Sequence, residues 1–192
     1  MKSKHTYEIS GYETTSELYL STSCTVLRAK REHDGKSVVL KILNPDMAGD
    51  VTRARYWEEY AIARRDELRS IVRAIDCISF KGTVAIVFED TGGVTLAELM
   101  KETTFSLSEC LKTGISITAA LKEIHGNGIV HKDLNPFNII MDRGSRELRL
   151  TDFGSASVLT KVSPNITDVN AMKGSSLAYM SQIGRASCRE RV

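Results

Sequence analysis

The chain contains 192 residues, of which 42% are hydrophobic and 26% charged, and its 26 basic and 24 acidic residues give a formal net charge of +2. This balance is ordinary for a globular protein, and the lack of a basic block argues against nucleic acid as a partner. No apolar run is long enough to span a membrane, and the first ten residues do not form the apolar core of a signal peptide. The four cysteines show neither metal-site nor disulfide spacing. We therefore expect a cytoplasmic protein without a membrane span.

The first part of the chain is predicted to be rich in β-strands. Runs of β-favouring residues flank the turn residues 33–36 and, further on, the pair at 81–82, and each pattern is typical of a hairpin. Between the hairpins, residues 50–69 favour a helix and contain neither glycine nor proline. The sequence Thr-Gly-Gly at 91–93 then interrupts the pattern and marks a joint.

The second part of the chain is predicted to be mainly helical. Ser106 and Glu109 have the spacing of a capping box, and Gly126 is a suitable C-terminal stop, so we expect a helix over residues 107–125. Apolar residues recur along it at helical spacing, namely Leu107, Leu111, Ile117, Leu121 and Ile124. Two short strands are expected around the segment DRGSRE at 142–147. The predicted fold class is α+β, with a β-rich half before a helix-rich half.

Five short motifs lie in a fixed order on these predicted elements. VVLK ends a hairpin strand at Lys41, Glu59 lies on the following helix, and FED at 88–90 closes a strand before the joint. HKDLNPFN at 131–138 then places an acid and an amide five positions apart, and DFG follows at 152–154. Together they resemble the strand lysine, helix glutamate, hinge, catalytic loop and magnesium loop of protein kinases. The HKDLNPxN pattern resembles the N-terminal kinase domain of large bacterial hybrid Ser/Thr–histidine kinases.

The resemblance implies a two-lobed protein-kinase-like fold over residues 7–181. Residues 7–90 would form the N-lobe and residues 94–181 an incomplete C-lobe. The segment LAYMS at 177–181 resembles the substrate-side loop of the family, but the next residues depart from its pattern. We expect residues 182–192 to be a non-native tail derived from a sequencing adapter, and the kinase domain to be truncated. Further domains are expected in cis in the full-length protein.

The resemblance also implies catalytic roles for several motif residues in phosphoryl transfer from ATP. Asp133 would accept the proton of the substrate hydroxyl. Lys41 would contact the α- and β-phosphates and would be positioned by Glu59. Asn138 and Asp152 would hold Mg²⁺.

Other positions implied by the resemblance concern the nucleotide and the transferred phosphate. The backbones of Glu89 and Thr91 would contact adenine. Ser21 and Ser23 lie in the segment that would cover the phosphates, which in the family is rich in glycine but here contains none. Asn135 replaces the lysine that in the family faces the transferring phosphate.

The leading hypothesis is ATP-dependent phosphorylation of serine or threonine hydroxyls on a protein substrate, with the fragment itself inactive. One alternative is a pseudokinase-type regulatory scaffold that binds nucleotide, favoured by the glycine-free loop and Asn135. Another is a small-molecule phosphotransferase of the aminoglycoside-kinase type, which shares the pattern H-x-D-x-x-x-x-N. The DFG motif and the SLAYM segment argue against this last class.

Overall fold

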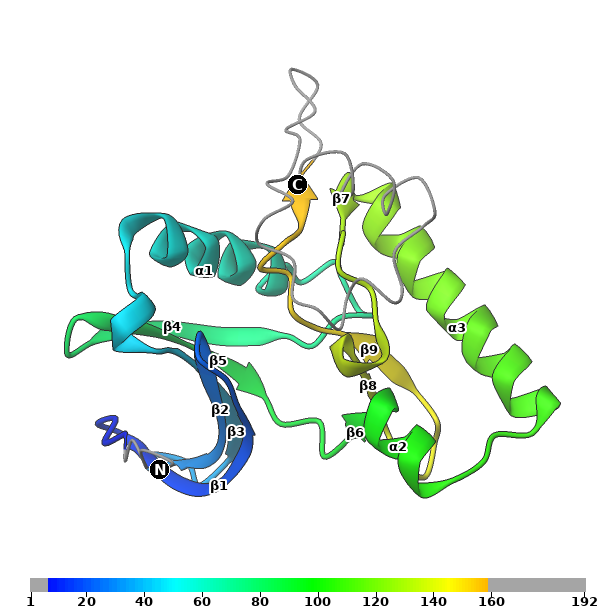
Figure 1. Cartoon of the computed structure of the whole chain (residues 1–192), viewed down its shortest axis with the longest axis horizontal. Helices are drawn as coiled ribbons and strands as arrows, with labels where there is room; N and C mark the ends of the chain where they lie inside the picture. The colour runs from blue at the N-terminus through cyan, green and yellow to red at the C-terminus, as the bar shows by residue number, and fades with distance from the viewer. Residues whose placement is uncertain (1–6, 159–192) are drawn as a thin grey trace, which may run out of the picture. The chain divides into compact units, whose positions relative to one another are not determined.

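The computed structural model describes residues 7–158, and the chain divides into two compact units whose boundary lies between Gly92 and Gly93 (Figure 1). The first unit is β-rich, and the second contains the longest helix together with short strands. The predicted α+β class is therefore confirmed. None of the helices within residues 7–158 is long and apolar enough to cross a membrane. The segments 177–181 and 182–192, on which two expectations rest, lie outside the described residues.

A five-stranded antiparallel sheet forms the framework of the first unit, with the strand order β1-β2-β3-β5-β4. Its strands are β1 (Tyr12–Leu20), β2 (Cys24–Arg31), β3 (Ser37–Leu43), β4 (Ala74–Phe80) and β5 (Thr83–Glu89). Both predicted hairpins are present, one joining β2 to β3 and the other joining β4 to β5. Alternate residues of the central strands point to one face and form its core, including Leu27, Ala29, Leu40, Ile42 and Val87.

The helix of the first unit, α1 (Asp50–Ala63), packs against β4 and β5 and follows a short 3-10 helix, η1 (Pro45–Met47). The sequence predicted a helix as far as residue 69, six residues beyond the observed end. Nothing in the local sequence stops the helix there. The chain turns away because Leu68, Ile71 and Val72 are buried in the unit, and their burial outweighs helix propensity.

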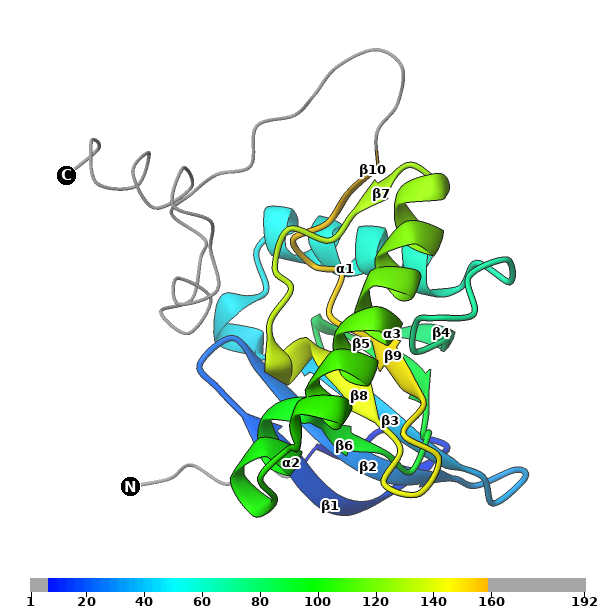
Figure 2. The same ribbon diagram turned by 90° about the vertical axis from the view of Figure 1, so that its right-hand side faces the viewer.

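The second unit begins with β6 (Val94–Thr95) and α2 (Leu96–Glu102), and its longest element is α3 (Leu107–Gly126). The elements that follow are β7 (Ile129–Val130), the 3-10 helix η2 (Pro136–Asn138), β8 (Ile139–Met141), β9 (Leu148–Leu150) and β10 (Ser157–Val158). The strands β8 and β9 are the predicted short pair, and β6 pairs with β8 to complete a three-stranded sheet. The other two strands, β7 and β10, pair with each other (Figure 2).

Gly93 is required where β6 begins, because the chain passes very close to β8. A Cβ atom at this position would meet Ile140 Cγ2 at 2.8 Å and the backbone oxygen of Met141 at 2.9 Å. Only glycine fits without moving the strand. The predicted joint at 91–93 therefore has a packing reason as well as a conformational one.

The predicted capping box of α3 is confirmed. Ser106 N–H donates to Glu109 Oε2 (2.8 Å), and Glu109 N–H donates to Ser106 Oγ (3.3 Å). A second capping box, between Thr95 and Glu98 at the start of α2, was missed although the T-x-x-E pattern is visible in the sequence. The expected stop at Gly126 was wrong by two residues, because the helix includes Gly126 and it is Gly128 that adopts the left-handed conformation (φ 71°).

Candidate active site

A buried ion pair joins β3 to α1 in the first unit. Lys41 Nζ lies 2.8 Å and 2.6 Å from the two carboxylate oxygens of Glu59. The Glu59 side chain is 1% exposed and that of Lys41 is 14% exposed, while the neighbouring Glu58 is exposed. Tyr56 contributes a cation–π contact, with its ring centroid 5.4 Å from Lys41 Nζ. A carboxylate this deeply buried requires a cation, so the pair holds the lysine ammonium in one place.

Asp133 lies in the catalytic-loop motif of the second unit, and two side-chain amides hold its carboxylate. Asn135 Nδ2 donates to Oδ1 (3.2 Å), and Asn138 Nδ2 donates to Oδ2 (3.2 Å). Both amides also donate to the backbone oxygen of Asp133, at 3.1 Å and 2.8 Å respectively. Asn135 and Asn138 are buried, whereas Asp133 is partly exposed. The arrangement fixes a carboxylate at the surface, as a proton acceptor requires.

Asn135 was predicted to stand where the family has a lysine facing the phosphate. In the structure its side chain is engaged at both ends, because Oδ1 accepts a hydrogen bond from Phe137 N–H (2.9 Å) while Nδ2 donates to Asp133. The first of these bonds caps the 3-10 helix η2. Asn135 is thus placed to orient Asp133, a contact that the sequence comparison with the family could not indicate.

Asn138 and Asp152 are linked through the backbone of Thr151, the residue directly before Asp152. Thr151 N–H donates to the backbone oxygen of Asn138 (3.0 Å), and Asp152 follows in the left-handed conformation (φ 64°). Because Asn138 Nδ2 is directed to Asp133, its Oδ1 is the atom suited to a metal ion. An amide oxygen and a carboxylate are ligands that Mg²⁺ prefers, with waters and phosphate completing the shell. The donor set therefore fits magnesium.

His131 connects the catalytic-loop motif to the DFG segment. It is 2% exposed, its Nε2 donates to the Thr151 carbonyl oxygen (2.9 Å), and its ring centroid lies 4.7 Å from that of Phe153. Burial lowers the pKa of His131 below its ordinary value, despite an opposing effect of the Thr151 carbonyl. Through these contacts His131 braces the two motifs against each other.

The side chain of Asp90 fixes the segment 89–91. Its neighbours Glu89 and Thr91 are the residues predicted to contact adenine. Arg28 Nε (2.7 Å), Ser37 Oγ (2.7 Å) and Gly92 N–H (3.0 Å) all donate to the carboxylate of Asp90. Burial raises the pKa of Asp90, but these donors outweigh it and the net pKa lies below the ordinary value. Glu89 N–H donates to the Arg73 carbonyl oxygen (3.0 Å), so an adenine contact by Glu89 would have to use its own carbonyl. No local sequence pattern predicted the Arg28–Asp90 pair.

Ser21 and Ser23 lie in the turn between β1 and β2, where the glycine-free loop was predicted. Their hydroxyl oxygens are 3.2 Å apart, and the hydroxyl of Ser21 also accepts from Cys24 N–H (3.1 Å). The turn is therefore closed by its own polar groups. Asn44, which sequence reasoning did not identify, bonds to this turn from the end of β3.

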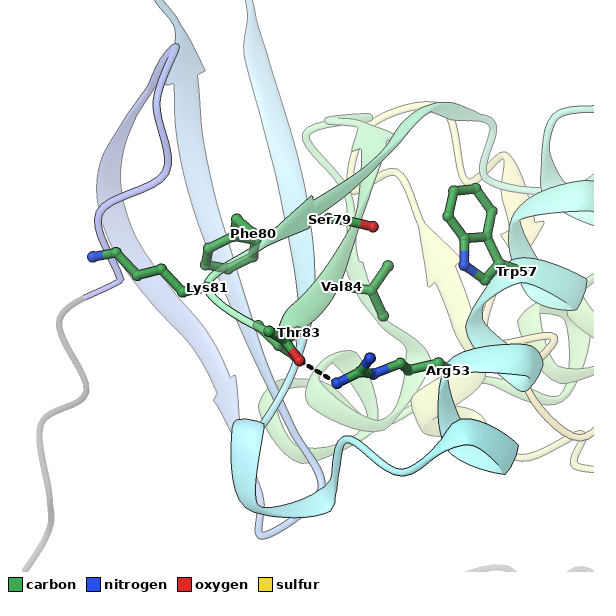
Figure 3. Close-up of a pocket in the computed structure, with 8 residues that line it drawn as sticks. Arg53, Trp57, Ser79, Phe80, Lys81, Thr83 and Val84 are labelled. Carbon is green, nitrogen blue, oxygen red and sulfur yellow. Dashed lines mark hydrogen bonds between the residues drawn. The ribbon is translucent and has the colours of Figure 1, made fainter.

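A groove of about 250 Å³ lies on the first unit between α1 and the turn joining β4 to β5 (Figure 3). Arg53 and Trp57 approach it from the helix, and Arg53 donates to the Gly82 carbonyl oxygen across it. None of the site residues predicted from the sequence lines this groove. It is therefore separate from the predicted chemistry.

Comparison with known proteins supports one family. A family model described as "Protein kinase domain" matches residues 12–182. The chain is 31% identical over 153 residues to a probable serine/threonine-protein kinase, pknA2, of Bifidobacterium longum, covering 74% of this chain and 19% of that protein. It is 27% identical over 156 residues to the serine/threonine-protein kinase PKH2 of Candida albicans, covering 80% of this chain and 16% of that protein.

Solved structures give the same result. The crystal structure of the Mycobacterium tuberculosis PknI kinase domain, in a double-mutant form, superposes with a TM-score of 0.66 at 26% identity, covering 77% of this chain and 60% of that one. The structure of the same domain without those mutations gives a TM-score of 0.64 at 25% identity. The chain spans less than two thirds of these solved chains, and less than a quarter of the curated relatives described above.

Proposed function

The chain belongs to the protein kinase domain family, and from this premise we propose that it carries the residues that transfer the γ-phosphoryl group of ATP to a serine or threonine hydroxyl of a protein. The names of its relatives, which are serine/threonine-protein kinases, support this acceptor. The observation that carries the proposal is the carboxylate of Asp133, with each oxygen held by a different buried amide.

Asp133 provides the base in this reaction. The substrate hydroxyl oxygen attacks the γ-phosphorus, the bond from that phosphorus to the β–γ bridging oxygen breaks, and ADP leaves. The hydroxyl proton passes to the carboxylate of Asp133. Since Asn135 and Asn138 already fix this carboxylate, little reorganisation is needed when the hydroxyl arrives.

Lys41 provides a positive charge for the α- and β-phosphates, and the buried carboxylate of Glu59 keeps its ammonium in place. Asn138 Oδ1 and the Asp152 carboxylate are the ligands proposed for Mg²⁺, which neutralises phosphate charge when bound. The backbones of Glu89 and Thr91 are proposed to bind adenine, with Asp90 holding the segment that contains them.

A regulatory module that binds nucleotide without transferring phosphate is the second candidate. The glycine-free turn between β1 and β2 favours it, because larger side chains limit how closely a backbone can approach phosphate. The contacts of Asn135 support the catalytic reading instead, since they orient the predicted base.

We further propose that residues 7–181 are an incomplete kinase domain of a cytoplasmic, multidomain protein, that residues 182–192 are non-native, and that the fragment alone is inactive. The similarity of LAYMS at 177–181 to the substrate-side loop supports this assignment. The sequence of the surrounding gene tests it, because it shows directly whether the chain continues with the rest of the domain.

The test of function uses a protein that carries this segment within a kinase domain of full family length. Mg-ATP binding and transfer of labelled phosphate to a serine- and threonine-containing protein are measured for the unaltered protein and for Asp133→Asn. We expect the substitution to lower turnover at least about 10²-fold while folding is retained. Binding without transfer in the unaltered protein would identify a regulatory module, and transfer only to small molecules would identify the aminoglycoside-kinase type.

A further inference from the structure

The turn between β1 and β2 contains no glycine, yet it leaves two backbone amides without a protein partner. Among residues 7–158, neither Thr22 N–H nor Ser23 N–H has a hydrogen-bond partner. The amides on either side are engaged, since Ser21 N–H donates to the Cys24 carbonyl oxygen (2.9 Å) and Cys24 N–H donates to Ser21 Oγ (3.1 Å). Adjacent free amides are the groups with which protein loops bind phosphate.

Asn44 binds the opposite side of this turn. Its Nδ2 donates to the carbonyl oxygens of Ser21 (2.8 Å) and Thr22 (3.0 Å), and its backbone N–H donates to the carbonyl oxygen of Ser23 (3.0 Å). Three consecutive carbonyl groups of the turn are therefore bonded to one residue. In a planar trans peptide the N–H points away from the C=O, so the amides of Thr22 and Ser23 are directed away from Asn44.

The side chain of Asn44 is itself held on its acceptor side. Its Oδ1 accepts from Tyr7 Oη (2.9 Å) and from Thr25 Oγ1 (3.0 Å). Asn44 also occupies the N-cap position of η1, where an asparagine side chain ordinarily accepts a hydrogen bond from the helix, but here it makes no capping bond. The amide is thus committed to the turn rather than to the helix that follows it.

We propose that Asn44 is a positioning residue that holds the turn 21–24 with the amides of Thr22 and Ser23 presented to the phosphates of ATP. The turn, which contains no glycine, would thus be held in shape by Asn44. This inference rests on the proposed function, because the family resemblance is what places phosphate at the turn.

The key variant is Asn44→Asp, which keeps the size of the side chain and its acceptor oxygens but removes both donors to the turn. In a protein that carries this segment within a kinase domain of full family length, we expect the affinity of the variant for ATP to fall about tenfold, equivalent to about 1.4 kcal/mol. Its affinity for adenosine should change by less than about twofold. The variant Asn44→Ala should show the same difference between ATP and adenosine. Because alanine carries no charge, agreement between the two variants excludes repulsion between the new carboxylate and the phosphates as the cause.

A measurement without nucleotide tests the turn by itself. Hydrogen–deuterium exchange in the dilute 192-residue chain should become about tenfold faster at the amides of Ser21 and Cys24 in both Asn44 variants. The matched control is Thr15→Val, which removes another side-chain bond between β1 and β2, from Thr15 Oγ1 to the Arg28 carbonyl oxygen. This control should leave exchange in the turn and both affinities unchanged.

Equal weakening of ATP and adenosine binding would overturn the inference, because it would show a general loss of structure. Unchanged ATP affinity in Asn44→Asp would overturn it as well. If the unaltered protein with a kinase domain of full family length binds neither ligand, the proposed function fails and the phosphate role fails with it. The exchange rates distinguish this case from a failure of Asn44 to hold the turn, since they require no nucleotide.

Discussion

Two buried amides, Asn135 and Asn138, each donate to a different oxygen of Asp133. Asn135 is the residue expected, from the family resemblance, to replace a lysine. A lysine at position 135 would bring a positive charge toward the phosphate, whereas an asparagine brings donors toward the base. The side chain at position 135 is therefore engaged within its own loop, with Asp133 and with Phe137 N–H.

Asn135→Ala should lower kcat more than it changes the KM for ATP. The substitution removes one donor from the Asp133 carboxylate and leaves Phe137 N–H without its acceptor. A hydrogen bond to a charged group contributes about 1.5–3 kcal/mol, so we expect a fall in kcat of about 10- to 100-fold. Steady-state kinetics in a protein with a kinase domain of full family length measure it. Asn127→Ala, at the end of α3, is the control and should leave kcat unchanged.

Asp90→Asn should make stability less dependent on pH below about pH 4. The pKa of Asp90 is lowered in the folded chain, so its contribution to stability is complete above the ordinary carboxyl pKa, 3.8, and is lost as pH falls through the lower folded value. Urea unfolding of the chain at several values between pH 7 and pH 3 measures this. The free energy of unfolding of the variant should be lower than that of the unaltered chain by about 1 kcal/mol at pH 7, and by less at pH 3. An identical loss at both values would show that the Asp90 charge is not the cause.

At the scale of elements, α1 presents adjacent glutamates to opposite environments. Glu59 faces β3 and pairs with Lys41, while Glu58 is exposed. The helix brings the pair together across 18 residues of sequence, and the burial of Tyr56 on the same side strengthens the lysine site. The position of α1 against β4 and β5 thus decides whether Glu59 reaches Lys41.

Glu59→Gln should destabilise the chain by about 3 kcal/mol, because it leaves a largely buried ammonium without its carboxylate. Glu58→Gln is the matched control on the next residue and should change stability by less than about 0.5 kcal/mol. Chemical denaturation of both variants measures the free energy of unfolding. Equal behaviour of the two variants would show that the ion pair does not hold the lysine.

At the scale of the whole molecule, α3 exposes an apolar face in the second unit. Leu107, Leu111 and Ile115 are 76%, 60% and 70% exposed, at a spacing that places them on one side of the helix, whereas Ile124 is buried. Burying a large apolar side chain contributes about 1.5–3 kcal/mol, out of a total stability of about 5–15 kcal/mol. An exposed face of this kind lowers the stability margin and favours association.

The 192-residue chain should therefore aggregate as its concentration rises, and it should show little stabilisation by Mg-ATP in thermal unfolding. The double variant Leu111→Lys, Ile115→Lys should remain monomeric to higher concentration, as measured by light scattering. Its control is Met47→Lys, Val51→Lys, which adds the same charge at exposed apolar residues of the first unit. A cooperative transition that shifts upward with Mg-ATP in the unaltered chain would contradict this prediction.

Local patterns in the amino-acid sequence are enough to predict most of the elements and the residues expected to carry the chemistry. Local patterns of residues predict the hairpins, the start of α3 and the ordered motifs around Lys41, Asp133 and Asp152. Such patterns can be read without knowing how the chain folds. Capping boxes are local in the same way, so the one at Thr95 was available and was overlooked.

The partners and the limits of these elements depend on tertiary packing. Arg28 and Asp90 are 62 residues apart, Asn44 reaches a turn more than 20 residues away, and α1 ends where Leu68 must be buried. Each of these features depends on which surfaces meet after the sheet has formed. Hydrogen-bond partners and burial follow from contacts between distant parts of the chain, and no local pattern of residues encodes them.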